Sequence, residues 1–188
     1  MEAFLISTGI VALAEMGDKT QLLALVLAAR FKRPWPIVWG ILVATLLNHA
    51  LAGLAGAWIM AAAGPGVMRW VLGVSFIAMA LWMLSPDKLD DENALPKRQM
   101  GVFFVTVWAF FLAEMGDKTQ IATVALGAQY DPLIAVVLGT TFGMMLANAP
   151  VVFFGDAITR KVPIALVHRV AAGIFAVLGV LALFGVGP

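Results

Sequence analysis

The sequence carries the octapeptide AEMGDKTQ twice, at residues 14–21 and again at residues 113–120. Each copy places two carboxylic acids, a lysine, a hydroxyl and a carboxamide inside a strongly apolar run. Carboxylate, hydroxyl and amide oxygens suit Ca²⁺, Mn²⁺ and Mg²⁺, whereas zinc and copper sites favour histidine and cysteine. The motif has no histidine and the chain no cysteine, so the octapeptide predicts binding of a hard divalent cation.

The spacing within each copy brings its polar groups together. Glu15 and Asp18 are three residues apart and Gln21 lies three further on, so a continuous helix carries all three on one face. Glu15 and Lys19 are four apart and can form an ion pair on the same helix. Gly17 either lets a neighbouring backbone approach closely or lets the helix open locally.

The composition places these charges in a membrane. Of the 188 residues, 62% are hydrophobic and 12% charged, and the mean hydropathy is +0.98; soluble domains carry about 25% charged residues. Six apolar stretches are each long enough to cross a hydrocarbon core of about 30 Å as a helix. They are residues 3–29, 35–61, 67–85, 100–128, 131–155 and 163–186. We therefore expect an all-α integral membrane protein with six transmembrane helices.

Charged side chains inside such helices are costly. An acid or a lysine at the centre of a transmembrane helix costs about 2.5–3.5 kcal/mol, so the three charges of one motif together cost roughly 8–10 kcal/mol. The charges must therefore meet partners or water inside the helix bundle. Ionisable groups at that depth indicate a functional site.

The chain divides into two related halves. An offset of 99 residues aligns Leu13–Gln21 with Leu112–Gln120 without a mismatch. Each half contains three spans, an odd number, so the halves cross the membrane in opposite directions. This predicts a 3+3 inverted-topology repeat in which the two octapeptides meet at mid-depth. The predicted units are a first repeat over 1–85, a cytoplasmic linker over 86–99 and a second repeat over 100–188.

Basic residues outside the spans or near their ends predict the orientation. Six alternating spans place nine of them on one side: Arg30, Lys32, Arg33, Lys88, Lys97, Arg98, Arg160, Lys161 and Arg169. Only Arg69 lies on the other side. The positive-inside rule makes the basic side cytoplasmic, so both termini face away from the cytoplasm. The first stretch has no basic n-region and is interpreted as a span, not a cleaved signal peptide.

The two polar faces together predict one metal site. Its carboxylate ligands, two from each copy, are Glu15, Asp18, Glu114 and Asp117. One lysine from each copy reduces the formal charge to −2, which one divalent cation neutralises. The supporting residues are Lys19, Lys118, Thr20, Thr119, Gln21, Gln120, Asn48 and Asn148, with Thr45 and Thr141 as weaker candidates. Acids clustered in a low dielectric disfavour one another's ionisation, so protons should replace the departing cation. Such an exchange is antiport.

Some of these residues have a plainer interpretation. The motifs could be structural ion pairs, Glu15–Lys19 and Glu114–Lys118. Two identical copies at matched depth, each with an additional aspartate, favour a functional site instead. Asn48 and Asn148 could equally form hydrogen bonds between helices instead of binding the cation. His49 is a weaker candidate for a proton relay, because the other half has no counterpart.

The doubled E-M-G-D-K-T in a six-span chain resembles the duplicated E-x-G-D-[KR]-[ST] signature of the cation/proton antiporters that export manganese and calcium. That family includes bacterial MneA-type exporters and belongs to the wider lysine-exporter superfamily. The resemblance covers essentially the whole chain and shows no departure from the signature. It implies a secondary transporter of Mn²⁺, with Ca²⁺ as the alternative, in the compact bacterial form. The motif residues Glu15, Gly17, Asp18, Lys19 and Thr20, with Glu114, Gly116, Asp117, Lys118 and Thr119, would carry that activity.

We predict export of a divalent cation from a bacterial cytoplasm, across the inner membrane, in exchange for protons. The cation is a substrate and no cofactor is expected. The expected partners are the cation, protons and the lipid bilayer, without nucleic acid. The sequence leaves open whether the protein forms a homo-oligomer. An uncoupled channel or an exporter of a basic amino acid would use the same acids. An intramembrane metalloenzyme needs a histidine ligand or nucleophile repeated with the acids, and the sequence has none, so we expect no enzyme.

Overall fold

A computed structural model of the chain describes residues 1–84, 101–155 and 164–185, and these residues form helices without any strand. The helices are α1 (Glu2–Glu15), α2 (Lys19–Phe31), α3 (Pro34–Trp82), α4 (Val102–Glu114), α5 (Lys118–Gln129), α6 (Leu133–Phe154) and α8 (Ile164–Leu183). The predicted linker 86–99 lies outside the described residues, as do five of the basic residues used for the orientation: Lys88, Lys97, Arg98, Arg160 and Lys161.

Two of the predicted spans are not continuous helices. The stretch 3–29 is divided into α1 and α2, and the stretch 100–128 into α4 and α5. Each break falls within an octapeptide, where Gly17 has a φ of 80° and Gly116 a φ of 78°. Positive φ ends a right-handed helix. Of the two roles considered for Gly17, local opening of the helix is therefore confirmed.

The two breaks have the same backbone conformation. Met16 and Met115 have φ/ψ of −63°/114° and −66°/117°. Asp18 and Asp117, the N-caps of α2 and α5, have −77°/167° and −79°/163°. Identical octapeptides thus fold into identical turns, although different neighbours surround them.

The glycine in this turn gives a first testable prediction. An added Cβ on Gly116 would meet nothing within 4 Å, so only the backbone conformation opposes substitution there. Gly116→Ala should destabilise the protein by about 1–2 kcal/mol, the cost of the left-handed region for an L-residue. Thermal denaturation in detergent measures this effect. The matched control is Gly9→Ala in α1, which also has open space but no positive φ and should not be destabilised. Equal losses in both variants would show that the turn is not what requires glycine.

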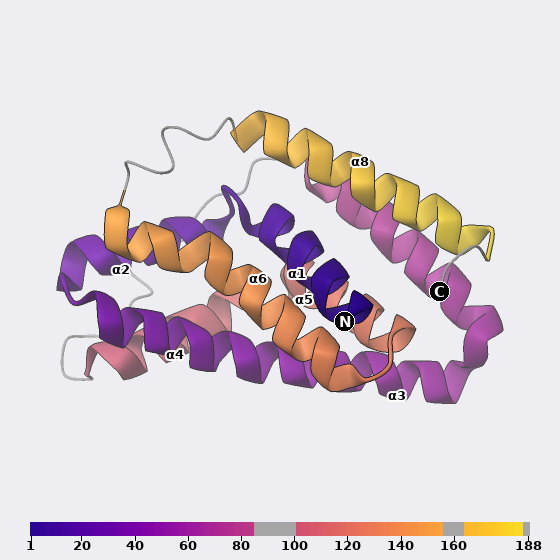
Figure 1. Cartoon of the computed structure of the whole chain (residues 1–188), viewed down its shortest axis with the longest axis horizontal. Helices are drawn as coiled ribbons and strands as arrows, with labels where there is room; N and C mark the ends of the chain where they lie inside the picture. Colours follow the sequence, from indigo (N-terminus) through magenta and orange to yellow (C-terminus); the bar gives the residue numbers. More distant parts are fainter. Residues whose placement is uncertain (85–100, 156–163, 186–188) are drawn as a thin grey trace.

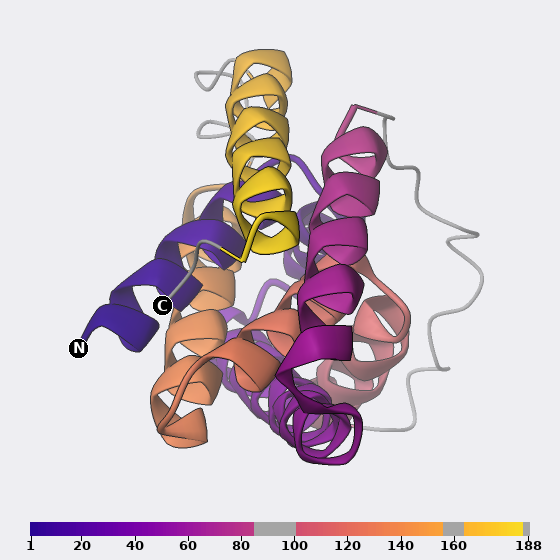
Figure 2. The ribbon, with the colours of Figure 1, turned by 90° about the vertical axis from the view of Figure 1, so that its right-hand side faces the viewer.

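Helix α3 runs through two of the predicted spans. Gly64, with φ 74° and ψ 168°, bends it sharply into an arm over Pro34–Gly64 and an arm over Gly66–Trp82. The first arm, α6 and residues Ala165–Leu183 of α8 are long and apolar enough to cross a membrane. Figure 1 shows the bend of α3 at the opposite end of the molecule from the α2–α3 connection. The second arm of α3 lies beside α8 (Figure 2).

The two halves of the chain interlock. Helix α1 packs on α6, and α4 packs on the first arm of α3. A Cβ on Gly139 would lie 2.5 Å from the Phe4 carbonyl oxygen, and one on Gly40 would lie 3.0 Å from that of Phe103. These two pairs are related by the same 99-residue offset as the octapeptides. Each half thus packs its first helix against a glycine of the other half, where small residues let backbones approach.

The distribution of side chains is inverted relative to that of a soluble protein. Leu51, Leu54 and Ile134 are exposed on α3 and α6, whereas the octapeptide acids are fully buried. Two apolar clusters fill the interior, one around Phe76 and Leu126 and the other around Ile41 and Phe110. An apolar exterior around buried charges suits a lipid environment.

Candidate functional site

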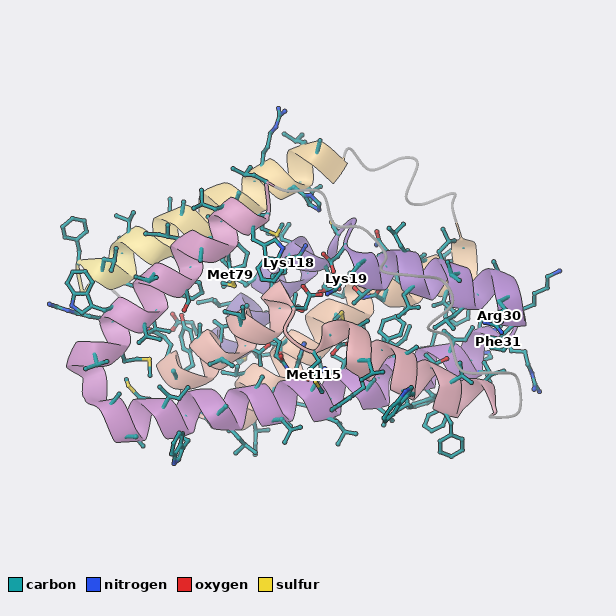
Figure 3. All side chains as sticks on the ribbon, turned by 180° about the vertical axis from the view of Figure 1, so that it is seen from behind. Lys19, Arg30, Phe31, Met79, Met115 and Lys118 are labelled. Atoms are coloured by element: carbon teal, nitrogen blue, oxygen red, sulfur yellow. The ribbon has the colours of Figure 1, made fainter. Side chains whose placement is uncertain are left out.

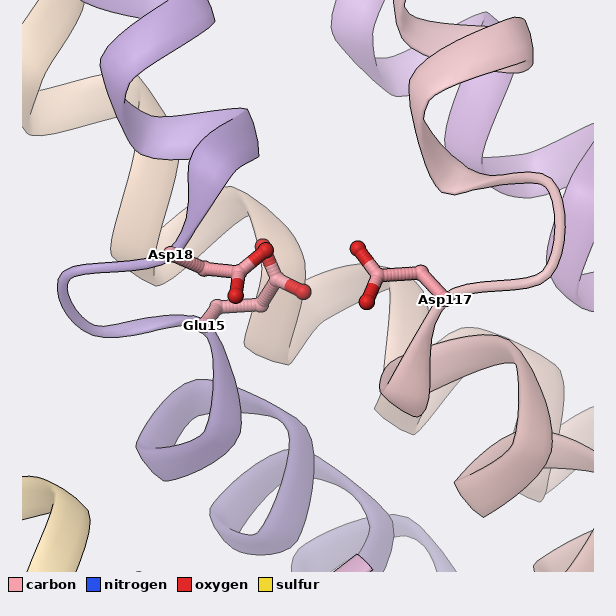
Figure 4. Close-up of side chains that lie close together, drawn as sticks. All are labelled: Glu15, Asp18 and Asp117. Atoms are coloured by element: carbon pink, nitrogen blue, oxygen red, sulfur yellow. The ribbon is translucent and has the colours of Figure 1, made fainter. Parts of the chain in front are cut away.

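The structure brings together acids from both octapeptides. Carboxylate oxygens of Glu15, Asp18 and Asp117 all lie within 4.8 Å of one another. Glu15 is the last residue of α1, and Asp18 and Asp117 are the N-caps of α2 and α5. Figure 4 shows Asp117 facing the other two carboxylates across the gap between the helix breaks. Three buried acids, two from the first octapeptide and one from the second, therefore form one group of oxygens that can hold a divalent cation.

Each lysine of the motif pairs with the aspartate of the other copy. Lys118 forms an ion pair with Asp18, and Lys19 Nζ lies 3.5 Å from Asp117 Oδ2. Figure 3 shows both lysines in the middle of the molecule, whereas Arg30 lies at one end. These pairs cross between the copies, whereas the plainer alternative, Glu15–Lys19 and Glu114–Lys118, needs the i, i+4 geometry of a continuous helix, which each break removes.

The two ion pairs are unequally buried. The Lys118 side chain is 2% exposed, whereas that of Lys19 is 24% exposed. The site is therefore more open on the side of Lys19. With each aspartate matched to a lysine, the remaining formal charge of −2 falls on the two glutamates, if both are ionised.

Glu15 is held by residues from two elements. Thr20 donates a hydrogen bond to its Oε2, and Asn148 Nδ2 lies 3.5 Å from the same oxygen. Thr119 of the other copy also lies beside this carboxylate. The other oxygen, Oε1, is buried and makes no hydrogen bond of normal geometry with any described residue. Buried carboxylate oxygens ordinarily have partners, so Oε1 is suited to a cation.

Glu114 lies just outside the three-carboxylate group. The Thr45 hydroxyl donates to its Oε1 at 2.7 Å, which gives this weaker candidate a definite place at the site. The charges of Glu15 and Asp117 both act on Glu114. Its Oε2 is buried without a hydrogen bond to the part of the chain that the structure describes. Glu114 therefore shares the electrostatics of the group without belonging to it.

The two glutamines stabilise the helix breaks. Gln21 Oε1 accepts from the Gly17 N–H at 3.0 Å, and Gln120 Oε1 accepts from the Gly116 N–H at 2.7 Å. Their amide groups reach the neighbouring helices, where Gln21 Nε2 donates to the Ala147 carbonyl. The glutamine oxygens predicted as cation ligands are thus already engaged by backbone.

The two asparagines are not equivalent. Asn48 uses both ends of its amide between helices, accepting from Gln120 Nε2 at 2.6 Å and donating to the Phe111 carbonyl at 3.1 Å. Asn148 lies against Glu15, and its Oδ1 is buried without a hydrogen bond to any described residue. Asn48 thus joins helices and also lies beside Glu114, whereas Asn148 lies beside Glu15, so a supporting role at the site stays a prediction for both.

Two side chains near the breaks had no predicted role. His168 of α8 donates from Nε2 to the Met16 carbonyl at 2.7 Å, which ties α8 to the first break. Met144 Sδ lies 3.0 Å from Asn148 Nδ2. No repeat or motif distinguishes either residue in the sequence. His49 is fully buried, and neither ring nitrogen hydrogen-bonds to a described residue, so its role as a proton relay stays a prediction.

The helix breaks also shape the electrostatics. The negative, carbonyl ends of α1 and α4 meet the positive, amide ends of α2 and α5 at the two turns. Asp117 Oδ1 accepts from the Lys118 N–H at 2.6 Å, which anchors the carboxylate on the amide end of α5. Broken helices whose free ends surround a buried site are typical of secondary transporters.

Comparison with known proteins also indicates a transporter. The family model of the divalent cation/proton antiporter GDT1 matches residues 3–91 and 102–187, so both halves of the chain fit it. A Vibrio cholerae protein, provisionally named a manganese exporter, is 52% identical over 93% of this chain and 87% of its own length.

More distant relatives also align over most of their length. GDT1-like protein 5 of Arabidopsis thaliana is 26% identical over 96% of this chain and 94% of its own. GDT1-like protein sll0615 of Synechocystis is 25% identical over 86% of this chain and 88% of its own length. No solved structure matches the chain. With a family model covering both halves and a bacterial relative sharing half of its residues, the chain belongs to the GDT1 family of divalent cation/proton antiporters.

Proposed function

We propose that this antiporter exports Mn²⁺ from a bacterial cytoplasm in exchange for protons. Glu15, Asp18 and Asp117 would bind the cation. The convergence of these three buried carboxylates from two octapeptides carries the proposal. The name of the Vibrio cholerae relative supports manganese as the cation, with Ca²⁺ as the alternative that the oxygen ligands also suit.

The proposed architecture is a six-span, 3+3 inverted-topology repeat with both termini outside the cytoplasm. Each broken pair, α1–α2 and α4–α5, would count as one span. The arms of α3, α6 and α8 would supply the other four. The matching turns of the two breaks and the reciprocal contacts of Gly40 and Gly139 support the repeat. Arg30 in the last turn of α2, with Lys32 and Arg33 between α2 and α3, supports a cytoplasmic position for that connection.

The crossed ion pairs suggest how the exchange is coupled. Lys118 and Lys19 neutralise Asp18 and Asp117. An entering divalent cation would compete with the lysines for these carboxylates and gain the oxygens of Glu15. Glu114, held by Thr45 beside the group, is the carboxyl placed to hold a proton when the cation is absent. The acids would then be neutralised either by the cation or by protons, which is the requirement for exchange.

Reconstitution into liposomes tests the function. A pH gradient, acidic on the side that protons leave, should drive Mn²⁺ uphill in the opposite direction, and a Mn²⁺ gradient should move protons. Parallel measurements use Ca²⁺, Mg²⁺ and lysine. Mn²⁺ flux that a pH gradient cannot drive would indicate a channel. Transport of lysine without Mn²⁺ would indicate an exporter of basic amino acids.

A further inference from the structure

A sulfur atom lies beside the proposed cation site. Met144 in α6 is fully buried, but neither apolar cluster among the described residues includes it. Its Sδ lies 3.0 Å from Asn148 Nδ2, and the same nitrogen lies 3.5 Å from Glu15 Oε2. A single amide group therefore separates the thioether from a carboxylate of the site.

The corresponding position in the first half carries oxygen. The 99-residue offset that relates Gly40 to Gly139 also relates Thr45 to Met144. Thr45 donates to Glu114 at 2.7 Å, whereas Met144 Sδ lies against the amide nitrogen of Asn148, which in turn lies beside Glu15. At matched positions, the first half thus carries a hard oxygen donor in Thr45 and the second half a soft sulfur donor in Met144.

Sulfur and oxygen ligands prefer different divalent cations. Thioether sulfur suits the softer transition metals, whereas Ca²⁺ and Mg²⁺ bind oxygen. Mn²⁺ also suits oxygen, but as a transition-metal ion it accepts a sulfur ligand more readily than the alkaline earths do. Methionine is also flexible, with three rotatable bonds, so Sδ can move toward a bound cation without backbone movement. The buried, unbonded Oδ1 of Asn148 is a second ligand that the same rearrangement would bring to the cation.

We propose that the Met144 thioether is a soft ligand that makes this site prefer transition-metal dications to Ca²⁺ and Mg²⁺. The inference rests on the proposed function, because it assigns the source of selectivity in the same site. The carboxylates supply affinity for any divalent cation, and the sulfur favours Mn²⁺ over the alkaline earths.

Transport selectivity tests the inference. Met144→Leu keeps the volume and apolar character of the side chain but removes the sulfur. In liposomes, it should lower the ratio of Mn²⁺ to Ca²⁺ transport, compared as kcat/KM, by about tenfold, in the range measured for groups that support a metal site. Met144→Thr, which copies Thr45, should shift the ratio in the same direction.

The matched control is the next residue of the same helix. Met145 packs at the apolar cluster around Ile41 and Phe110, so Met145→Leu should leave the ratio unchanged. An unchanged ratio in both Met144 variants would overturn the inference. A wild-type protein that exchanges no divalent cation for protons would instead overturn the proposed function.

A spectroscopic measurement is independent of transport. The chain has no cysteine, so any sulfur bound to a metal must come from methionine. X-ray absorption at the cadmium edge of protein loaded with Cd²⁺ should show one sulfur neighbour in the wild type and in Met145→Leu. The sulfur should be lost in Met144→Leu. A shell of oxygen alone in the wild type contradicts the proposal, whether or not the variants fold.

Discussion

Asp18→Asn should abolish pH-driven Mn²⁺ transport, with a loss of more than about 100-fold, since even groups that only support a metal site cost about 10–100-fold. The substitution removes a charge from the three-carboxylate group and also removes the partner of buried Lys118. Asp117→Asn should have a comparable effect, because Asp117 supplies the carboxylate from the other octapeptide. Transport in liposomes, normalised to inserted protein, measures both losses.

Two controls separate the site from the fold. Asp131→Asn alters an exposed aspartate between α5 and α6 and should leave transport unchanged. Asp18→Asn alone takes the Asp18 partner away from the buried charge of Lys118, and breaking a buried ion pair in this way costs about 3–5 kcal/mol of stability. The double variant Asp18→Asn with Lys118→Met removes that charge, so it should regain stability in detergent while transport stays absent. Recovery of transport in the double variant would show that Asp18 serves only the ion pair.

Lys118→Met should slow export while tightening cation binding. Lys118 is almost fully buried against Asp18, so its removal takes away the competitor that the entering cation must displace. We expect the KM for Mn²⁺ and the turnover each to fall by about tenfold or more, within the range of a coupling of a few kcal/mol between buried charges. Binding and transport measured on the same preparation separate the two effects.

The second lysine provides the comparison. Lys19 is 24% exposed and lies 3.5 Å from Asp117, so solvent screens its pair more strongly. Lys19→Met should therefore change KM and turnover less than Lys118→Met. Lys118→Arg, which keeps the charge, should recover part of the turnover. Equal effects of the two methionine substitutions would show that the unequal burial has no functional consequence.

The sequence predicts the meeting of the octapeptides but not their local structure. Duplication and an odd number of spans per half place Glu15 and Asp18 opposite Asp117, and the three carboxylates do converge. The periodicity of the apolar residues continues through Gly17, so it predicts one helix where two exist. Glycine followed by aspartate is a known signal for a helix end and a new N-cap, and this signal would have located the break.

The partners of the lysines could not be predicted from spacing. A continuous helix directs Lys19 toward Glu15, whereas the break turns it toward Asp117. Likewise, position alone makes Met144 an ordinary core residue. The contact of its sulfur with Asn148 depends on which rotamer packing selects, and periodicity carries no information about that.

The reciprocal packing of the two halves has a consequence for biogenesis. Helix α1 contacts a glycine of α6, and Asp18 pairs with a lysine of α5. Both partners belong to the second half of the chain, which is synthesised after the first. Until then the nascent chain must hold unmatched charges near the insertion machinery or at the lipid–water boundary. We therefore expect assembly to be completed only after the second half is inserted, so that neither half matures as an autonomous unit.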